Sequence, residues 1–64
     1  MTLNGEIKEC AEGITVENLL DLCKLDKNRI AVELNAQILS RKEFSTQVLK
    51  EEDTLEVVTF VGGG

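Results

Sequence analysis

Residues 54–64 have the sequence TLEVVTFVGGG, in which a run of β-branched and apolar residues leads directly into three glycines. Alternate residues of a β-strand point to opposite faces of a sheet, so Leu55 and Val57 share one face. Val58 and Phe60 share the other face. A strand that is apolar on both faces is typical of the middle of a sheet, and this run is therefore predicted to be the central strand.

A helix is predicted at residues 16–23. Four apolar residues there occupy positions i, i+3, i+4 and i+7, which form one stripe along a helix. They are Val16, Leu19, Leu20 and Cys23. Thr15 is placed to cap the N-terminus, where Glu17 also suits the positive end of the helix dipole. Lys24 and Lys27 suit the negative end.

The remaining strands are predicted from turn signals and alternation. Residues 1–3 and 6–10 are expected to form a hairpin, because Asn4-Gly5 is a strong signal for a two-residue turn. Residues 30–34 place branched apolar side chains on one face and are predicted to form a third strand.

Shorter elements are predicted between this third strand and the central one. In order, they are a turn at Asn35-Ala36, an edge strand at Ile38-Leu39, one helical turn near Phe44, an extended piece at residues 47–49 and a solvated turn at residues 50–53. Ser40, followed three positions later by Glu43, resembles a capping box that opens the helical turn.

This order of elements predicts an α+β fold with a mixed sheet of four to five strands packed on one main helix. One long helix covers only one face of such a sheet, so the other face is expected to be partly wet. Leu55 and Val57 are the predicted core residues beneath the helix. Val58 and Phe60 are placed on the uncovered face, where exposed apolar residues indicate a contact surface. The alternative is a local cluster packed under the segment around Phe44.

Composition restricts the possible functions. The 64 residues allow one small domain, predicted at residues 1–61, and no large enclosed active site. Twelve acidic and seven basic side chains give a net charge of −5, which disfavours nucleic-acid binding. The absence of histidine excludes imidazole catalysis, and no nucleophile and base pair is apparent. No apolar run approaches the roughly 20 residues that span a membrane. A cytoplasmic protein that is not an enzyme is therefore expected.

Two groups of side chains are weak candidates for chemistry. Cys10 and Cys23 lack the short spacing of redox or zinc sites, so reduced structural thiols are expected. A thiol that receives sulfur or forms a mixed disulfide remains the alternative. Glu51, Glu52 and Asp53 lie on the predicted solvated turn and lack calcium-loop spacing, so no metal site is predicted.

The chemistry is expected at the end of the sequence, Val61-Gly62-Gly63-Gly64. Glycine adopts almost any backbone angles, so residues 62–64 are predicted to form a flexible tail that fits a narrow channel of another protein. The terminal carboxylate would become reactive once ATP had adenylated it. A thiol, persulfide or amine could then attack. The alternative is that these glycines are frayed or introduced by cloning.

The whole chain resembles the ThiS family, small sulfur carriers of bacterial thiamine biosynthesis with the ubiquitin-like β-grasp fold. The matching segments are Asn4-Gly5, residues 13–16, Leu19-Leu20, residues 31–35, residues 38–41 and residues 53–64. The glycine ending is the specific part of this match. Ser40 stands where many relatives carry proline, and Phe44 stands where tryptophan is frequent.

This resemblance implies that Gly64 is adenylated by a ThiF-like adenylyltransferase and converted to a thiocarboxylate. Gly62 and Gly63 would form the threading tail, and ATP would be used by the partner rather than bound as a cofactor by this chain. A sulfur donor such as a cysteine desulfurase and a thiazole synthase (ThiG-like) as acceptor are implied as partners. Val58, Phe60 and Val61 are the candidate partner-binding residues.

Three alternatives stay open at this point. A related carrier could deliver sulfur to the molybdopterin precursor or another acceptor, since the chemistry at Gly64 would be the same. A ubiquitin-like modifier would instead transfer its acyl group to lysines. A plain binding module would have an idle tail.

Overall fold

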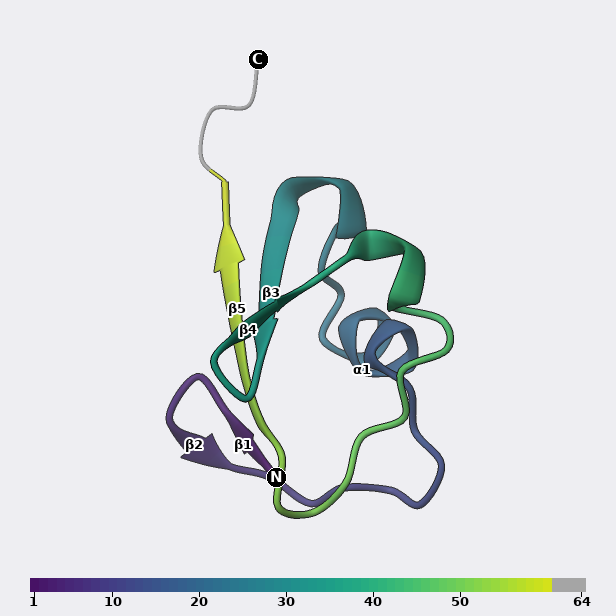
Figure 1. Cartoon of the computed structure of the whole chain (residues 1–64), viewed down its shortest axis with the longest axis vertical. Helices are drawn as coiled ribbons and strands as arrows, with labels where there is room; N and C mark the ends of the chain where they lie inside the picture. The colour runs from purple at the N-terminus through teal and green to yellow at the C-terminus, as the bar shows by residue number, and fades with distance from the viewer. Residues whose placement is uncertain (61–64) are drawn as a thin grey trace.

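The structure is a computed structural model and describes residues 1–60. Within this range the chain forms five strands, one α-helix and two 3-10 turns (Figure 1). In chain order they are β1 (Thr2–Leu3), β2 (Glu6–Ile7), α1 (Val16–Leu22), η1 (Lys27–Arg29), β3 (Ile30–Leu34), β4 (Gln37–Leu39), η2 (Arg41–Glu43) and β5 (Thr54–Thr59). The domain boundary predicted at Val61 lies outside the described residues.

The strands form one mixed sheet in the order β2-β1-β5-β3-β4. β5 pairs with β1 in parallel, with Leu3 opposite Leu55, and with β3 antiparallel, with Ile30 opposite Thr59. The hairpin β1-β2 and the pair β3-β4 are antiparallel. The prediction of a mixed sheet with the C-terminal strand at its centre is therefore confirmed.

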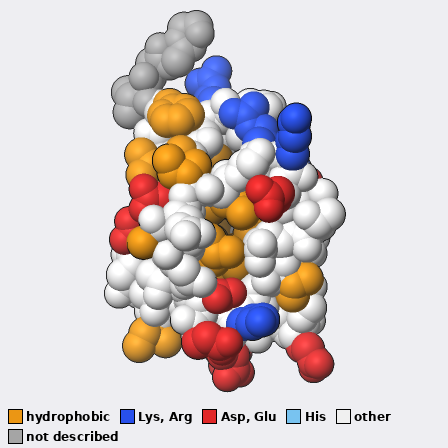
Figure 2. Space-filling model, in the orientation of Figure 1, with side chains coloured by type: hydrophobic (Ala, Val, Ile, Leu, Met, Phe, Trp, Pro, Cys, Tyr) orange, Lys and Arg blue, Asp and Glu red, His pale blue; other side chains and the backbone are white. Residues whose placement is uncertain are grey.

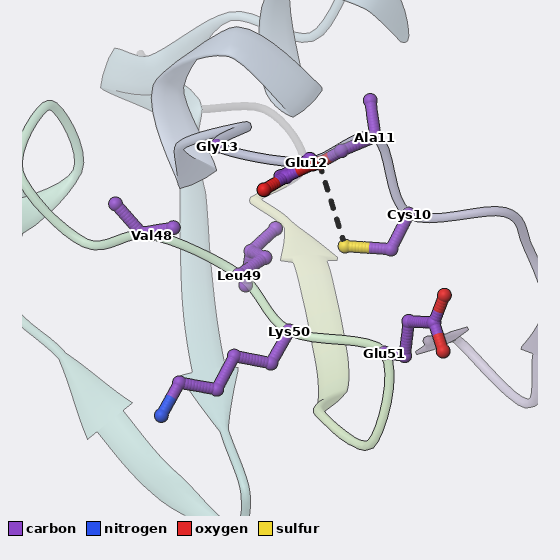
Figure 3. A pocket seen from close by; sticks show the side chains of 8 residues that line it. All are labelled: Cys10, Ala11, Glu12, Gly13, Val48, Leu49, Lys50 and Glu51. Carbon is purple, nitrogen blue, oxygen red and sulfur yellow. Dashed lines mark hydrogen bonds between the residues drawn. The ribbon is translucent and has the colours of Figure 1, made fainter.

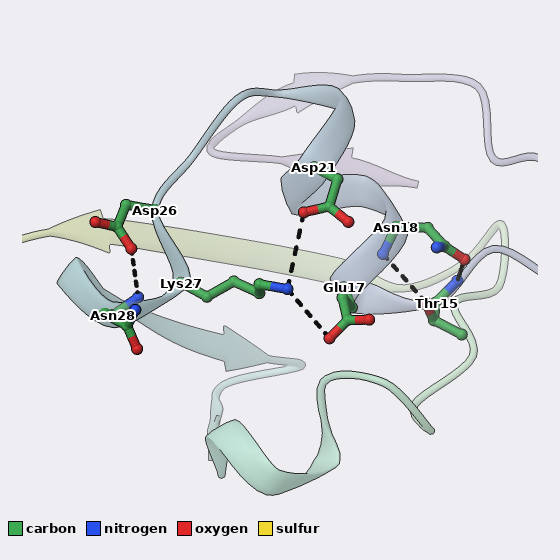
Figure 4. Close-up of polar contacts among 7 residues, drawn as sticks. All are labelled: Thr15, Glu17, Asn18, Asp21, Asp26, Lys27 and Asn28. Atoms are coloured by element: carbon green, nitrogen blue, oxygen red, sulfur yellow. Dashed lines mark hydrogen bonds and ion pairs between the residues drawn. The ribbon is translucent and has the colours of Figure 1, made fainter.

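The helix begins where the sequence predicts, at Val16 after the N-cap Thr15. The Thr15 hydroxyl oxygen accepts from the backbone N–H of Asn18 at 3.1 Å, and the Asn18 side-chain oxygen accepts from the N–H of Thr15 at 3.4 Å (Figure 4). These two bonds satisfy donors that a helix N-terminus leaves free. Lys27, from η1, places its ammonium 3.2 Å from the carboxylate of Glu17 and 3.8 Å from that of Asp21.

The end of the helix differs from the prediction. Lys24 and Lys27 do not lie in the last turn, because the helix ends at Leu22. Lys24 has a φ of 58° and reverses the chain, so that the N–H of Leu25 reaches the carbonyl of Leu20 at 3.0 Å. Leu25 therefore packs against the core, and Cys23, predicted to be on the buried stripe, is exposed.

The core lies between α1 and one face of the sheet (Figure 1). Its buried residues are Met1, Leu3, Val16, Leu19, Leu20, Ile30, Val32, Phe44, Leu49 and Leu55. Leu55 is fully buried and Val57 packs against the cluster, so the predicted choice of core face on β5 is confirmed. The extended piece around Val48 lies beside the start of α1, where the N–H of Leu49 donates to the carbonyl of Ile14 at 2.8 Å.

Three smaller predictions are wrong in part. The second strand of the hairpin ends at Ile7 rather than residue 10. Ser40 does cap the turn η2, but its hydroxyl oxygen accepts from the N–H of Lys42 at 3.4 Å, and the reciprocal bond of a capping box is not among those found in residues 1–60. Asp53 is not solvated: it is buried, and its carboxylate accepts from the Asn35 side chain and the Lys50 N–H.

Candidate functional site

The sheet face opposite α1 is uncovered, and we call it the outer face. Strand alternation, with Val32 and Leu55 pointing into the core, places six residues of the three strands β3, β4 and β5 on it, and Phe60 continues the row just after the end of β5. The six are Ala31, Glu33, Ile38, Thr54, Glu56 and Val58. The side chains of Val58 and Phe60 are 58% and 52% exposed, as predicted. The alternative of a local cluster under Phe44 is wrong, because Phe44 belongs to the single core instead.

Pairing holds β5 in place up to the last described residue. Ala31 lies opposite Val58, and the N–H of Phe60 donates to the carbonyl of Arg29 at 2.8 Å. The described part of β5 is therefore held by the sheet up to Phe60, at one end of the molecule (Figure 1). Val61 and the glycines 62–64, which the sequence marks as the site of chemistry, lie outside the described residues.

Asn4 supports the other side of β5, which sequence reasoning did not anticipate. β1 ends at Leu3, but the Asn4 side-chain oxygen accepts from the N–H of Val57 at 2.8 Å. The side chain thus continues the ladder by one bond after the backbone of β1 has turned away with a φ of 49°. The Asn4-Gly5 pair indicates the turn in the sequence. The hydrogen bond is not indicated by any local pattern, because its donor, Val57, lies 53 residues away.

Basic side chains gather near the end of β5, although the chain as a whole is acidic. Figure 2 shows Lys and Arg side chains at the top of the molecule, close to the point where the described part of β5 stops. Arg29 borders the strand through its bond with Phe60, and Arg41 reaches the Asn28 side chain at 3.4 Å. Arg29 also lies 3.6 Å from the carboxylate of Asp26, with both side chains exposed.

A shallow pocket, seen from close by in Figure 3, lies between two segments that Figure 1 places at the other end of the molecule from the end of β5. It has a volume of about 370 Å³ and is lined by residues 10–13 and 48–51. Cys10 is half-buried at its wall, with its thiol 3.9 Å from the carbonyl of Ala11. Within residues 1–60 both cysteines are free.

No group of three or more Cys, Asp or Glu side chains in residues 1–60 is arranged to hold a metal ion. In the same range no helix has the length and apolar character needed to cross a membrane. Within residues 1–60 the geometry offers a central strand that runs to one end of the molecule, with exposed apolar side chains beside it.

Comparisons with known proteins agree with this architecture. A sequence profile of the ThiS family matches residues 1–64. The crystal structure of the thiamine biosynthesis protein ThiS from Geobacter metallireducens superposes with a TM-score of 0.79, at 35% identity over 98% of this chain and 96% of that one. The sulfur carrier protein ThiS of Bacillus subtilis is 32% identical over 65 residues, which cover 100% of this chain and 98% of the relative.

Longer relatives are found as well. A thiazole synthase of Magnetococcus marinus is 42% identical over 62 residues, which make up 97% of this chain but only 19% of that protein. The ThiS family profile matches the full sequence, the Geobacter structure shares the sheet and helix, and the match to the Bacillus relative covers almost all of that protein. The chain therefore belongs to the ThiS family and has its β-grasp fold.

Proposed function

We propose that this protein is a sulfur carrier of thiamine biosynthesis, which presents a thiocarboxylate at Gly64 to a thiazole synthase. The observation that carries the proposal is the alignment with the Bacillus subtilis sulfur carrier, which extends over 98% of that relative and all of this chain. The position of β5 at the centre of the sheet supports it, because the strand runs to one end of the molecule and the sequence continues from there to the glycines.

In the proposed reaction the Gly64 carboxylate oxygen attacks the α-phosphorus of ATP and pyrophosphate leaves. The resulting acyl-adenylate is an electrophile, so a sulfur nucleophile can attack its carbonyl carbon and displace AMP. A persulfide would first give an acyl disulfide, which a thiol then cleaves to the thiocarboxylate and a disulfide. ATP is bound and consumed by the partner, and the carrier acts as a cosubstrate rather than as an enzyme.

The proposal assigns a role to each part of the molecule. Gly62 and Gly63 lack a Cβ and would fit a channel too narrow for larger residues. Val58, Phe60 and Val61 would contact the partner at the mouth of that channel. The partners would be a ThiF-like adenylyltransferase, a sulfur donor such as a cysteine desulfurase and a ThiG-like thiazole synthase, and the reaction would take place in the cytoplasm. Matches to longer proteins named thiazole synthase support the choice of acceptor.

The test is the intact mass of the chain after incubation with ATP, a ThiF-like adenylyltransferase and a sulfur donor. We expect a gain equal to the replacement of one oxygen by sulfur. A chain that lacks Gly64 should show no gain, because its carboxylate falls one residue short of the adenylating site. Gly64→Ala, which keeps the length and the carboxylate, is the matched control and should be converted at least partly.

Two results would contradict the whole proposal, and a third would contradict its acceptor. If the enzyme modifies its own carrier but leaves this chain unchanged, the chain is not a sulfur carrier for that class of enzyme. If the activated chain instead appears as a ladder of covalent conjugates on lysines, it is a ubiquitin-like modifier. If the sulfur is transferred to a molybdopterin precursor and is not used by a thiazole synthase, the proposed chemistry at Gly64 stands and only the acceptor changes.

A further inference from the structure

The pair Asn4-Gly5 forms the two-residue turn between β1 and β2, and both residues are exposed. An asparagine followed by glycine can lose its side-chain amide, because the backbone nitrogen of the next residue can attack the side-chain carbonyl carbon and close a five-membered ring. A Cβ on that next residue hinders the attack, and glycine has none. The position that a Cβ of Gly5 would occupy has no heavy atom within 4 Å beyond its chain neighbours, so the turn is open on this side.

The two nitrogen atoms that would react make no hydrogen bond found in residues 1–60. The backbone N–H of Gly5, whose nitrogen would attack, lies outside both strands of the hairpin and donates none of the backbone hydrogen bonds there. The side-chain nitrogen of Asn4, which would leave as ammonia, donates none of the side-chain hydrogen bonds. Within the described residues, the reaction therefore breaks no hydrogen bond donated by either nitrogen.

The sheet polarises the carbonyl group that would be attacked. Val57 on β5 donates its backbone N–H to the side-chain oxygen of Asn4 at 2.8 Å. Attack on the carbonyl carbon places negative charge on this oxygen, and a hydrogen-bond donor already aimed at the oxygen stabilises that charge. The backbone N–H of Asn4 is itself bound to the carbonyl of Leu55 at 2.9 Å, which keeps the residue beside β5. The fold thus supplies one donor of the kind that forms an oxyanion hole.

We propose that Asn4 is a site of spontaneous deamidation in the folded protein, and that the reaction releases β5 from the Asn4 side chain. The Gly5 nitrogen loses its proton to hydroxide and bonds to the side-chain carbon of Asn4. The bond from that carbon to the amide nitrogen breaks, and the nitrogen takes a proton from water and leaves as ammonia. Water then opens the cyclic imide at either carbonyl, which gives aspartate or isoaspartate at position 4. The proposal is independent of the proposed function.

The two products differ in their effect on β5. Aspartate keeps an oxygen acceptor at the same distance from the backbone, so the bond from the Val57 N–H is retained. In isoaspartate the backbone runs through the former side-chain carbon, and the remaining carboxylate is attached directly to Cα. This carboxylate is one methylene shorter, and the hairpin turn is one atom longer. The backbone of β1 pairs only two residues with β5, so the isoaspartate product weakens the support of the strand that leads to Gly64.

The test is prolonged incubation of the purified folded chain in neutral buffer, followed by intact mass and peptide mapping. We expect a mass change equal to the replacement of NH2 by OH, located at position 4, and methyl transfer from S-adenosylmethionine by a protein isoaspartate methyltransferase. Gly5→Ala is the matched control and should slow the change by at least about tenfold, because its Cβ hinders the attack. A hairpin turn of this fold accepts alanine at its second position, since Ala36 has a φ of 69°.

Asn35 is an internal control in the same sample. It lies in the other two-residue hairpin turn with a φ of 51°, close to the 49° of Asn4, and its side-chain oxygen also accepts a backbone N–H, that of Thr54. Its side-chain nitrogen, however, donates to the Asp53 carboxylate at 3.0 Å, and the next residue is alanine. Asn35 should therefore keep its amide while Asn4 loses it.

The effect on the strand is measured on the two separated products. Hydrogen exchange at the Val57 amide should be faster in the isoaspartate form and as slow as in the unmodified chain in the aspartate form, in salt that screens the added charge. The Tm of the isoaspartate form should fall by about 4–8 °C, the shift expected for the loss of one hydrogen bond.

Three outcomes would overturn the proposal or its consequence. If the folded chain keeps the Asn4 amide while the same chain unfolded in urea loses it, the fold protects the pair and the proposal is wrong; this comparison needs no variant. If folded Gly5→Ala loses the amide as fast as the wild type, ring closure through Gly5 is not the route. If the isoaspartate form retains slow exchange at Val57, the reaction occurs but does not release the strand.

Discussion

Ala36 is held in a backbone conformation that its side chain disfavours. Asn35 and Ala36 form the two-residue turn between β3 and β4, with φ angles of 51° and 69°. Turns of this kind need positive φ at both central positions, which asparagine adopts readily and alanine adopts only at a steric cost. The surrounding pairs of Leu34 with Gln37 and Glu33 with Ile38 impose the turn on the alanine.

We therefore expect Ala36→Gly to stabilise the protein, by about 0.5–1 kcal/mol after the greater entropy of glycine in the unfolded chain is allowed for. For a domain of this size such a gain corresponds to a rise in Tm of about 2–8 °C. Ala11→Gly is the control, because Ala11 is also exposed but has no positive φ. It should lower the Tm slightly, and an equal rise in both variants would contradict the strain argument.

Asp53 shows why single residues of the sequence can mislead. It lies in the run Lys50-Glu51-Glu52-Asp53, whose charge predicts a solvated turn. Its carboxylate instead links two segments, accepting from the Asn35 side chain at 3.0 Å and from the Lys50 N–H at 2.8 Å. The buried position depends on a partner 18 residues away, and neighbouring residues in the sequence carry no sign of it.

At the scale of elements, β1 is too short to support all of β5. The backbone of β1 supplies two paired residues, and the Asn4 side chain then takes the next N–H of β5, that of Val57. Asn4 has a second function, because it also adopts the positive φ of the hairpin turn. Glycine at this position would keep the turn and lose only the hydrogen bond to the strand.

We expect Asn4→Gly to lower the free energy of unfolding by about 0.5–1.5 kcal/mol and to speed hydrogen exchange at the Val57 amide. Asn4→Asp retains an acceptor and tolerates the turn, so it should keep the slow exchange when measured in salt that screens the added charge. Exchange at Val57 that is equally slow in the glycine variant would show that this bond does not hold the strand.

Elements with a strong local pattern were predictable, and their ends were not. The stripe of Val16, Leu19 and Leu20 and the cap at Thr15 are local, and both are confirmed. Cys23 continues the same stripe, yet it is exposed because Lys24 reverses the chain and Leu25 packs in its place. Lysine at a position with positive φ has no sequence signature, whereas glycine there would have marked the end of the helix.

At the scale of the molecule, the two faces of the sheet have different roles. One face packs against α1, with Val32 and Leu55 fully buried, and the other leaves Val58 and Phe60 exposed. The alternation of residues in β5 predicted both faces. The opposition of Glu33 and Glu56 could not be predicted in the same way, because it depends on the register between strands more than 20 residues apart in the sequence.

This division of faces predicts that Phe60 contributes more to binding than to folding. Its side chain is 52% exposed at the end of the strand that leads to Gly64, so its removal costs the free chain little packing. We expect Phe60→Ala to weaken binding to the adenylyltransferase by about 5- to 30-fold, as for an aromatic residue central to an interface. The Tm should fall by less than about 4 °C, which corresponds to a loss of under 1 kcal/mol.

Leu22→Ala is the matched control, because Leu22 is a large exposed hydrophobic residue, 73% exposed, at the end of α1 on the other side of the sheet. It should change the Tm by a similar small amount and leave binding to the enzyme unchanged. A loss of affinity in both variants would indicate that exposed apolar side chains bind the enzyme without regard to face. A loss of Tm in Phe60→Ala that accounts for its loss of affinity would make Phe60 a residue of the fold rather than of the interface.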